Sequence, residues 1–496
     1  MAAYLRPGVF VEETLNPLPP AAGPNAQSVA AFIGTSDRGP IAATLITSWS
    51  QFTNLYGGFG STNALHTAVL LFFSNGGGAC YVRRTVGAGA QAATRDFNDR
   101  GTSPAAGLSL DAANPGAWGN DINVSISNSA TGESVDVTVY YGGVTTSDIV
   151  ERFTDLTMGA NDERYLVGVI NGQSKYLIAS DLGSDETGVN RLPVVATNQA
   201  LATGANGASV TESAITGDAG AFDTIQNSLI LNAPGVTETA AVNNLISYAT
   251  GRGDAFVIVD PVAGNVAAQL TASESYTASS YAAVYYPRLS IKDPTSTVSG
   301  VTALVSPGGA IAGIYASTDA ARGVFKAPAG LAARIAGAVA VAPLTNSELD
   351  ALNSASAAVN AIKYVTGSGI VVMGSRTLRS TYVDKYVPVR RTLIFLRKTL
   401  TDLTTFAVFE PNDAKLWRAI TAACEGMLLN FWRQGGLRGA TPAQAFFVKC
   451  DAETNPQSSI DNGVVNIEIG VALQRPAEFV VIKIGQFDGG STVTVA

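Results

Sequence analysis

A long amphipathic helix in the C-terminal fifth of this 496-residue chain is the feature that most constrains its fold. Residues 412–434 carry apolar side chains on one face at helical spacing, with Asn412 as the predicted N-cap and two glycines after the run. Residues 407–412 are predicted to form a strand before the helix, and further β-rich runs follow it up to residue 486. The region is therefore predicted to be an α+β domain. The core face of its helix is expected to consist of Leu416, Ile420, Met427, Leu428 and Phe431.

The composition of the chain fits a protein that hides much of its surface. Its length allows for about three domains of ordinary size, yet only 14% of its residues are charged and 46% are hydrophobic. So low a charge content is unusual for a monomer whose whole surface must stay hydrated. A subunit packed against neighbouring subunits would tolerate it, and so would a large single enzyme with an extensive core.

Several classes of protein are disfavoured by what the sequence lacks. No run of about 18 apolar residues predicts a transmembrane helix, and residues 1–20, interrupted by prolines, do not resemble a secretory signal. Cys80, Cys424 and Cys450 are too widely spaced for a disulfide framework or a zinc site, so buried thiols are favoured over a disulfide between subunits. The only histidine, His66, is expected on the polar face of a helix. No catalytic constellation, cofactor site or metal site is therefore predicted.

Charge is distributed unevenly along the chain. Residues 1–300 hold 13 basic and 25 acidic side chains, a net charge of −12, whereas residues 301–496 hold 18 and 14, a net charge of +4. The basic excess lies in residues 376–438, with 11 basic and 5 acidic residues. A basic region on an acidic protein indicates a polar partner. An acidic protein surface fits at least as well as nucleic acid, since no dense basic run or RNP-type aromatic motif accompanies the charges, and we expect no nucleic-acid partner.

Patterning along the chain predicts a mixed α/β core that is split by an inserted domain. Residues 1–27 are predicted to be an N-terminal extended arm and linker, because prolines flank one short β-prone run. Buried strands alternate with helices in residues 28–94 and again in 221–375, so the two stretches together form the predicted core. Residues 95–220 are rich in short alternating strands, such as 121–128, and are predicted to be a β-rich domain that is inserted into this core and faces outward.

The sequence also predicts a C-terminal domain and one helix of the core. Residues 376–486 are predicted to be the C-terminal α+β domain with an arm strand at its end, and residues 487–496 a flexible tail. Within the core, residues 62–77 are predicted to form a helix with one apolar face. That face is expected to consist of Leu65, Val69, Phe72 and Phe73.

Short motifs, taken in chain order, resemble those of contractile phage tail sheath proteins. They include a Pro-Gly-aromatic-Val-Glu-Glu opening at residues 5–13, a Pro-Gly-x-Trp-Gly-Asn stretch in 114–124, and the run RPAEFVV at 475–481. The matches cover most of the chain and are weakest over 125–220, and Arg288 stands where relatives often carry an aromatic residue. Further matching segments lie at 32–40, 281–294, 306–330, 367–378, 386–391 and 407–412.

The resemblance implies a structural subunit of a contractile tail sheath, without enzymatic activity. Such subunits polymerise helically around a tail tube and contract to drive the tube through the host cell envelope for genome delivery. The implied partners are further copies of the chain, the tail tube protein, and the baseplate and tail terminator proteins, with no membrane insertion. The implied location is the tail sheath of the virion, after assembly in the host cytoplasm. Alternatives are the sheath of a non-phage injection system and an α/β enzyme, such as a hydrolase, with an inserted β domain.

The same resemblance implies that neighbouring subunits exchange extended arms. Main-chain hydrogen bonds at a sheet edge would hold such arms without a rigid side-chain interface. For the run near the C-terminus, an ordinary internal strand of its own domain is the alternative. The candidate strand residues are Val9, Phe10, Val11 and Glu12 in the N-terminal arm, and Phe479, Val480, Val481, Ile482, Lys483 and Ile484 near the C-terminus.

Three basic residues of the helix at 412–434 are candidates for contact with the tube. Lys415, Arg418 and Arg433 lie largely off the predicted apolar face. A solvated helix face without a partner is the alternative interpretation of the same three residues.

Overall fold

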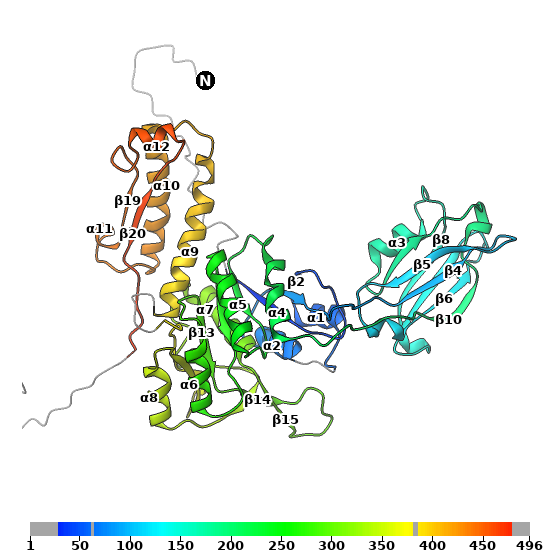
Figure 1. The fold of residues 1–496 in the computed structure, drawn as a ribbon, viewed down its shortest axis with the longest axis horizontal. Coiled ribbons are helices and arrows are strands. Elements are labelled where there is room, and N and C mark those ends of the chain that lie inside the picture. The colour runs from blue at the N-terminus through cyan, green and yellow to red at the C-terminus, as the bar shows by residue number, and fades with distance from the viewer. Residues whose placement is uncertain (1–27, 61–63, 380–384, 479–496) are drawn as a thin grey trace, which may run out of the picture.

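The computed structural model of the protein describes residues 28–60, 64–379 and 385–478. Figure 1 shows three parts in a row: a tall pair of helices with a small sheet, a central α/β body, and a β-rich part joined to that body by extended connections. Within the described ranges, no helix is long and apolar enough to cross a membrane. The two predicted arm strands, at residues 9–12 and 479–484, lie outside the described residues.

An eight-stranded sheet forms the centre of the molecule. Six strands run parallel. Their sequences are nearly continuous apolar runs, because strands covered on both faces need apolar side chains on both sides. The two edge strands run antiparallel to their neighbours. The order across the sheet is β18 (Gly369–Val372), β17 (Val359–Val365), β13 (Ala282–Tyr286), β12 (Ala255–Val259), β11 (Leu229–Asn232), β1 (Val29–Gly34), β3 (Cys80–Arg84) and β2 (Thr44–Ile46).

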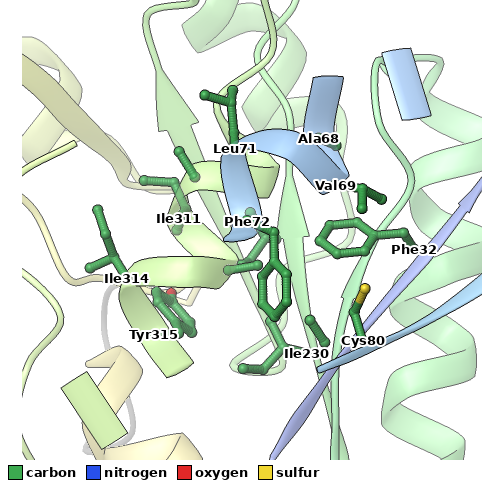
Figure 2. Packing of buried hydrophobic residues seen from close by; sticks show 14 of the residues in the cluster. Phe32, Ala68, Val69, Leu71, Phe72, Cys80, Ile230, Ile311, Ile314 and Tyr315 are labelled. Atoms are coloured by element: carbon green, nitrogen blue, oxygen red, sulfur yellow. The ribbon is translucent and has the colours of Figure 1, made fainter. Parts of the chain in front are cut away.

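Helices cover both faces of this sheet. On one face, α2 (Ala64–Ser74) packs against α7 (Gly308–Arg322), and Figure 2 shows Phe72 of α2 lying among Phe32, Ile230 and residues of α7. On the other face, α5 (Thr239–Arg252) buries apolar side chains against the alternate residues of the same strands. The prediction of an apolar face on α2 is confirmed for Leu65, Val69 and Phe72, which are buried, whereas Phe73 is half-buried.

Shorter elements complete the central body. A three-stranded antiparallel sheet has β14 (Leu289–Lys292) between β15 (Thr302–Val305) and β16 (Ala338–Val341). The remaining helices of the body are α1 (Trp49–Tyr56), α4 (Glu212–Gly217), α6 (Val266–Ser275) and α8 (Asn346–Ser354).

Glycines let the backbones of α2 and α7 approach each other closely. A Cβ atom built on Gly309 would lie 2.1 Å from the carbonyl oxygen of Ala68, and one built on Gly313 would lie 2.5 Å from that of Phe72. Neither carbonyl can move without distorting α2, because both belong to its backbone. The packing of these two helices therefore depends on the absence of side chains at two positions of α7.

The predicted position of His66 on a polar helix face is wrong. The side chain is only 1% exposed, and its ring lies 5.1 Å from that of Phe52 and 5.9 Å from that of Phe59, measured between ring centroids. The physical reason is that α2 is surrounded: α1 and α7 both contact it, so nearly the whole of its circumference is buried.

The β-rich part has its own pair of sheets and its own apolar core. The strand expected at 121–128 is confirmed as β6 (Ile122–Asn128), which pairs with β7 (Val135–Tyr141). No strand of this part, among the described residues, belongs to the eight-stranded sheet, whose strands come from before β4 and after β10. The first sheet has the strand order β10 (Ala196–Ala200), β6 (Ile122–Asn128), β7 (Val135–Tyr141) and β8 (Ile149–Leu156). The second sheet has the order β4 (Thr94–Asn98), β5 (Ala106–Ala112) and β9 (Leu177–Asp181). The α-helix of this part is α3 (Leu166–Gln173).

Two long helices and a two-stranded sheet form the C-terminal part. The core face predicted for the second helix is confirmed, since all five of its residues are buried, and Trp417 and Cys424 join them. The elements are α9 (Val387–Thr404), α10 (Ala414–Arg433), α11 (Pro442–Ala445), β19 (Phe446–Lys449), α12 (Gln457–Asp461) and β20 (Glu468–Val471).

The start of α10 differs from the prediction in two respects. Residues 407–412 do not form a strand: a 3-10 turn, Thr405–Ala407, leads into a bend in which Phe409 has a φ of 69°. The N-cap is Asp413, whose carboxylate accepts hydrogen bonds from the backbone N–H groups of Lys415 and Leu416. Asn412 instead accepts a hydrogen bond from the indole N–H of Trp417 at 2.8 Å. Asp413 is preferred because its charge also interacts favourably with the helix dipole.

We expect Gly309→Ala to destabilise the protein, because the new methyl group must push α7 away from the backbone of α2. Overpacking of this kind costs about 1–3 kcal/mol in the free energy of unfolding, measurable by chemical denaturation. Gly251→Ala is the matched control. Gly251 also lies inside a helix, no atom lies within 4 Å of its added Cβ, and the change should stabilise the helix by about 0.5–1 kcal/mol. Equal effects of the two substitutions would contradict the close-packing account.

Candidate assembly interface

The small sheet of the C-terminal part lies on α10 and has two open edges. β19 and β20 pair antiparallel, with Phe446 opposite Val471 and Lys449 opposite Glu468. Side chains on their inner face, such as Ile469, contact the apolar residues of α10. Among the described strands, each pairs only with the other, so the outer edge of each carries backbone N–H and C=O groups with no strand beside them. Such edges are ready templates for a further strand.

The segment that leads to the predicted C-terminal arm is anchored at Glu478. The Arg376 guanidinium donates two hydrogen bonds to the Glu478 carboxylate, both of 2.7 Å, and the Tyr386 hydroxyl donates a third of 3.1 Å. A bidentate pair of this kind is strong and directional. The chain therefore passes residue 478 at a fixed point beside the central body, although the strand residues that follow are outside the described range.

The three basic residues that were predicted to face the tube lie on one side of α10. Lys415, Arg418 and Arg433 are all exposed. Lys415 and Arg433 are 18 positions apart, which is five helical turns, so they point in the same direction, and Arg418 is one turn from Lys415. The buried residues of α10 lie on the other side. The geometry is that of an exposed basic stripe, and it fits both a partner and a solvated face.

Part of the basic excess in residues 376–438 is internal to the molecule. Arg376 is paired with Glu478, Arg391 with Asp319, and Lys398 with Asp402. Arg376 and Arg391 are 12% and 2% exposed, so neither can present its charge to a distant partner. The sequence count therefore overstates the positive charge on the surface of this region.

Arg391 is the most deeply buried of these basic residues, and it joins α9 to α7. Its guanidinium donates two hydrogen bonds to the carboxylate of Asp319, one of them 2.9 Å long, and lies 4.6 Å from the ring centroid of Tyr315. The Tyr315 hydroxyl is in turn 2.5 Å from that of Tyr285 in the central sheet. Burial alone would lower the pKa of Arg391, but the charge of Asp319 and its hydrogen bonds outweigh burial and raise this pKa. The guanidinium of Arg391 is therefore permanently charged, and the carboxylate of Asp319 compensates for the cost of burying that charge.

Sequence reasoning missed this ion pair and the pair at Glu478. The available signal was a charged residue within an otherwise apolar helical stretch, as with Asp319 in IAGIYASTDAAR and Arg391 in VPVRRTLIF. The sequence alone does not show which acidic residue pairs with which basic residue, because the partners are 72 and 102 positions apart in the chain.

The predicted burial of the three thiols is confirmed. Cys80 and Cys424 are fully buried and Cys450 is 8% exposed. Burial raises the pKa of Cys424 to about 11, which keeps the thiol protonated and unreactive at neutral pH. Within the residues that the structure describes, no three His, Cys, Asp or Glu side chains are grouped as metal ligands.

Comparison of the sequence with known proteins points to one family. Residues 384–486 match the phage tail sheath C-terminal domain. The tail sheath protein of Vibrio phage KVP40 is 28% identical over 179 residues, which are 35% of this chain and 25% of that protein. The chain thus spans about a quarter of the length of this curated relative.

Comparison of the fold extends over nearly the whole chain. The contracted helical sheath of the anti-feeding prophage shares 23% identity and a TM-score of 0.60, covering 97% of this chain and 99% of that one. The sheath tail protein of Listeria innocua shares 13% identity and a TM-score of 0.62, covering 90% and 94%. The sheath of an extracellular contractile injection system in its contracted state shares 23% identity and a TM-score of 0.53, covering 98% and 99%.

The mixed α/β fold is therefore similar to that of solved sheath proteins. In sequence, residues 384–486 match the phage tail sheath C-terminal domain, and a stretch of 179 residues is similar to a curated tail sheath protein.

We expect Asp319→Ala to destabilise the protein by about 3–5 kcal/mol, because it leaves the buried guanidinium of Arg391 without a counter-charge. The double variant Asp319→Leu with Arg391→Met should recover most of this loss, since no charge is then buried. Denaturation midpoints measure both effects. Glu453→Ala, which breaks the exposed pair with Lys449, is the control and should cost at most about 1 kcal/mol. Equal losses for Asp319→Ala and Glu453→Ala would show that the buried ion pair contributes no more to the free energy of unfolding than the exposed one.

Proposed function

We propose that this chain is the structural subunit of a contractile sheath, which polymerises helically around a tail tube and contracts to drive the tube through a cell envelope. The observation that carries the proposal is the match of residues 384–486 to the phage tail sheath C-terminal domain, in the part of the chain that holds the open-edged sheet. The subunit is then a component of the tail sheath of a virion or of a phage-like particle, with assembly in the host cytoplasm. Its role is mechanical and not enzymatic.

The work of contraction is, in this proposal, stored in the lattice during assembly. Subunits that bury more surface, or better matched surface, in the contracted lattice make contraction favourable once a trigger releases it. The baseplate is the proposed site of that trigger, and the tail tube and tail terminator proteins are the further proposed partners. Relatives of similar fold come from a contracted helical sheath and from a baseplate assembly, which supports self-assembly and an association with the baseplate.

A sheath of a non-phage injection system is the second candidate. Two relatives of similar fold belong to the anti-feeding prophage and to an extracellular contractile injection system. The mechanical role of the subunit is the same in both candidates, and only the delivered cargo differs. The genes that flank the coding sequence would separate them, because a virion needs capsid and packaging proteins.

Arm exchange is the proposed link between subunits. We assign residues 9–12 of one copy and residues 479–484 of another to the open edges of β19 and β20 on a third. The unpaired edges and the fixed position of Glu478 support this assignment. Each added strand contributes main-chain hydrogen bonds, and a linker such as residues 14–27, which follows the N-terminal strand, can swing while the strand stays paired.

The β-rich part is the proposed outer layer of the sheath. We propose that residues 95–220 are a domain inserted into a core formed by residues 28–94 and 221–375. Its separate apolar core and the origin of the central strands on either side of it support this division. Residues 376–486 then form the inner domain that carries the open edges.

Electron microscopy of the purified protein tests the proposed function directly. A sheath subunit should form tubes or helical fragments, whereas an α/β enzyme with an inserted β domain should give discrete particles. Discrete particles at every protein concentration and salt concentration would contradict the proposal.

Deletion of residues 1–13 should leave a folded protein that no longer forms long tubes. The reason is that the deleted segment would pair with another copy and contribute nothing to its own core. Thermal unfolding should be unchanged, and the length of polymers in electron micrographs should fall sharply. Tubes of full length from the truncated protein would rule out arm exchange by this segment.

Reversal of charge at Lys415, Arg418 and Arg433 to Glu should weaken assembly around tubes if the basic stripe of α10 faces an acidic tube. Raised salt should weaken it in the same way, because exposed charges are screened beyond about 8–10 Å at physiological ionic strength. Polymerisation without tubes should persist. The matched control reverses Arg152, Arg164 and Lys175, which are exposed basic residues of the β-rich part. Unchanged tube-templated assembly at low salt would show that the stripe is only a solvated helix face.

A further inference from the structure

The turn between α9 and α10 exposes three large apolar side chains. Phe406, Val408 and Phe409 are 47%, 62% and 103% exposed, and we call them the apolar knob. Phe409 also has a φ of 69°, a left-handed conformation that is strained for a bulky residue. Two unfavourable features therefore coincide at one side chain, which is fully exposed among the described residues. Exposed apolar clusters of this kind mark contact sites.

An apolar groove lies at the other end of α10, where it approaches α7 and α9. The groove has a volume of about 580 Å³. One wall carries the small residues Ala316 and Ala320, and the aromatic rings of Phe325, Phe395 and Phe431 line it. The Phe431 ring lies 5.8 Å from that of Phe325 and 5.4 Å from that of Phe395, between centroids. One further aromatic ring would extend this cluster in the geometries that aromatic pairs prefer.

The knob and the groove cannot meet within one molecule. The knob precedes the first turn of α10, and Phe431 lies in its last turn, so the 20 residues of the helix separate them by about 30 Å. Figure 1 shows α9 and α10 standing side by side, with α7 near the end of the pair that is opposite the α9–α10 turn. A knob at one end and a groove at the other form a heterologous contact, which generates rings or open helical filaments.

Charge beside the two features favours a second copy of the same chain as the occupant. Glu410, next to Phe409, is exposed, and so is Arg322, which precedes the groove residue Gly323. Neither side chain forms an ion pair with another of the described residues. Opposite charges beside an apolar contact guide its orientation.

We propose that Phe409 of one copy inserts into the groove of the next copy, with Glu410 placed beside Arg322. The inference rests on the proposed function, since it requires a polymer, and it adds a side-chain contact to the proposed exchange of arms. The knob then sets the spacing of neighbouring copies along the direction of α10, while the arms keep them connected.

A disulfide trap across the contact provides the closest test. The variants Phe409→Cys and Ala320→Cys are prepared separately, mixed, allowed to polymerise and oxidised mildly. All three native cysteines are buried, so little disulfide formation through them is expected in the background. We expect a covalent dimer of twice the 51.0 kDa chain mass in the mixture and not in either variant alone. Tyr364→Cys, at a residue that is 65% exposed and far from the groove in sequence, replaces Phe409→Cys in the control mixture and should give no dimer.

Substitutions without cysteine separate the possible occupants. Phe409→Ala and Ala320→Trp should each raise the concentration needed for polymerisation about tenfold or more, as for an interface hot spot, with an unchanged thermal midpoint. Glu410→Arg should weaken polymerisation, and Arg322→Glu in the same chain should restore it.

Three outcomes would overturn the proposal. If Phe409→Ala affects only assembly around tubes, the knob contacts the tube protein. If Ala320→Trp alone blocks polymerisation, another segment, such as residues 1–27, occupies the groove. If polymers form normally in every variant and no disulfide appears, the contact does not exist, although the proposed function stands. Failure of the unmodified chain to polymerise would overturn both proposals.

Discussion

The buried ion pair between Arg391 and Asp319 joins α9 of the C-terminal part to α7 of the central body. α9 enters the core of the central body through Ile394 and the core of the C-terminal part through Leu396, two positions later. Apolar contacts of this kind are tolerant of sliding, whereas a bidentate pair that is buried under Tyr315 allows one arrangement only. Together with the Arg376–Glu478 pair and the apolar contacts of α9, this ion pair sets the position of α10 and of the β19–β20 sheet relative to the central sheet.

The proposed subunit combines a rigid contact between α9 and α7 with open edges on β19 and β20 that can pair with other copies. In the proposed sheath, the change of lattice on contraction has to occur between copies, because the buried ion pair and the glycine-dependent contact of α2 with α7 oppose movement within a copy. Strands added to the edges of β19 and β20 would keep neighbours connected through their backbones while side-chain contacts change. The combination suits a machine that moves by rearranging subunits and not by unfolding them.

Many of the helices and strands could be predicted from the sequence, whereas the side-chain contacts between distant segments could not. Continuous apolar runs such as Ala255–Val259 predicted buried strands, and the 3.6-residue spacing of Leu416, Ile420 and Phe431 predicted the buried face of α10. The helix α9 was not foreseen, because its β-branched residues do not favour a helix by themselves and tertiary burial outweighs that preference. The N-cap was misplaced by one residue, since Asn412 and Asp413 are both good capping residues. Asp413 adds a charge that interacts favourably with the helix dipole, and Asn412 is hydrogen-bonded to Trp417 instead. The partners Asp319 and Glu478 could not be predicted at all from spacing.

A density map of the assembled polymer, at a resolution that separates β-strands, tests the central claim most directly. The account predicts that β19 and β20 become the inner strands of a larger sheet, whose added strands come from residues 9–12 and 479–484 of neighbouring copies. A polymer in which both outer edges of the β19–β20 pair remain without a strand would contradict the account, because the subunits would then be connected in some other way.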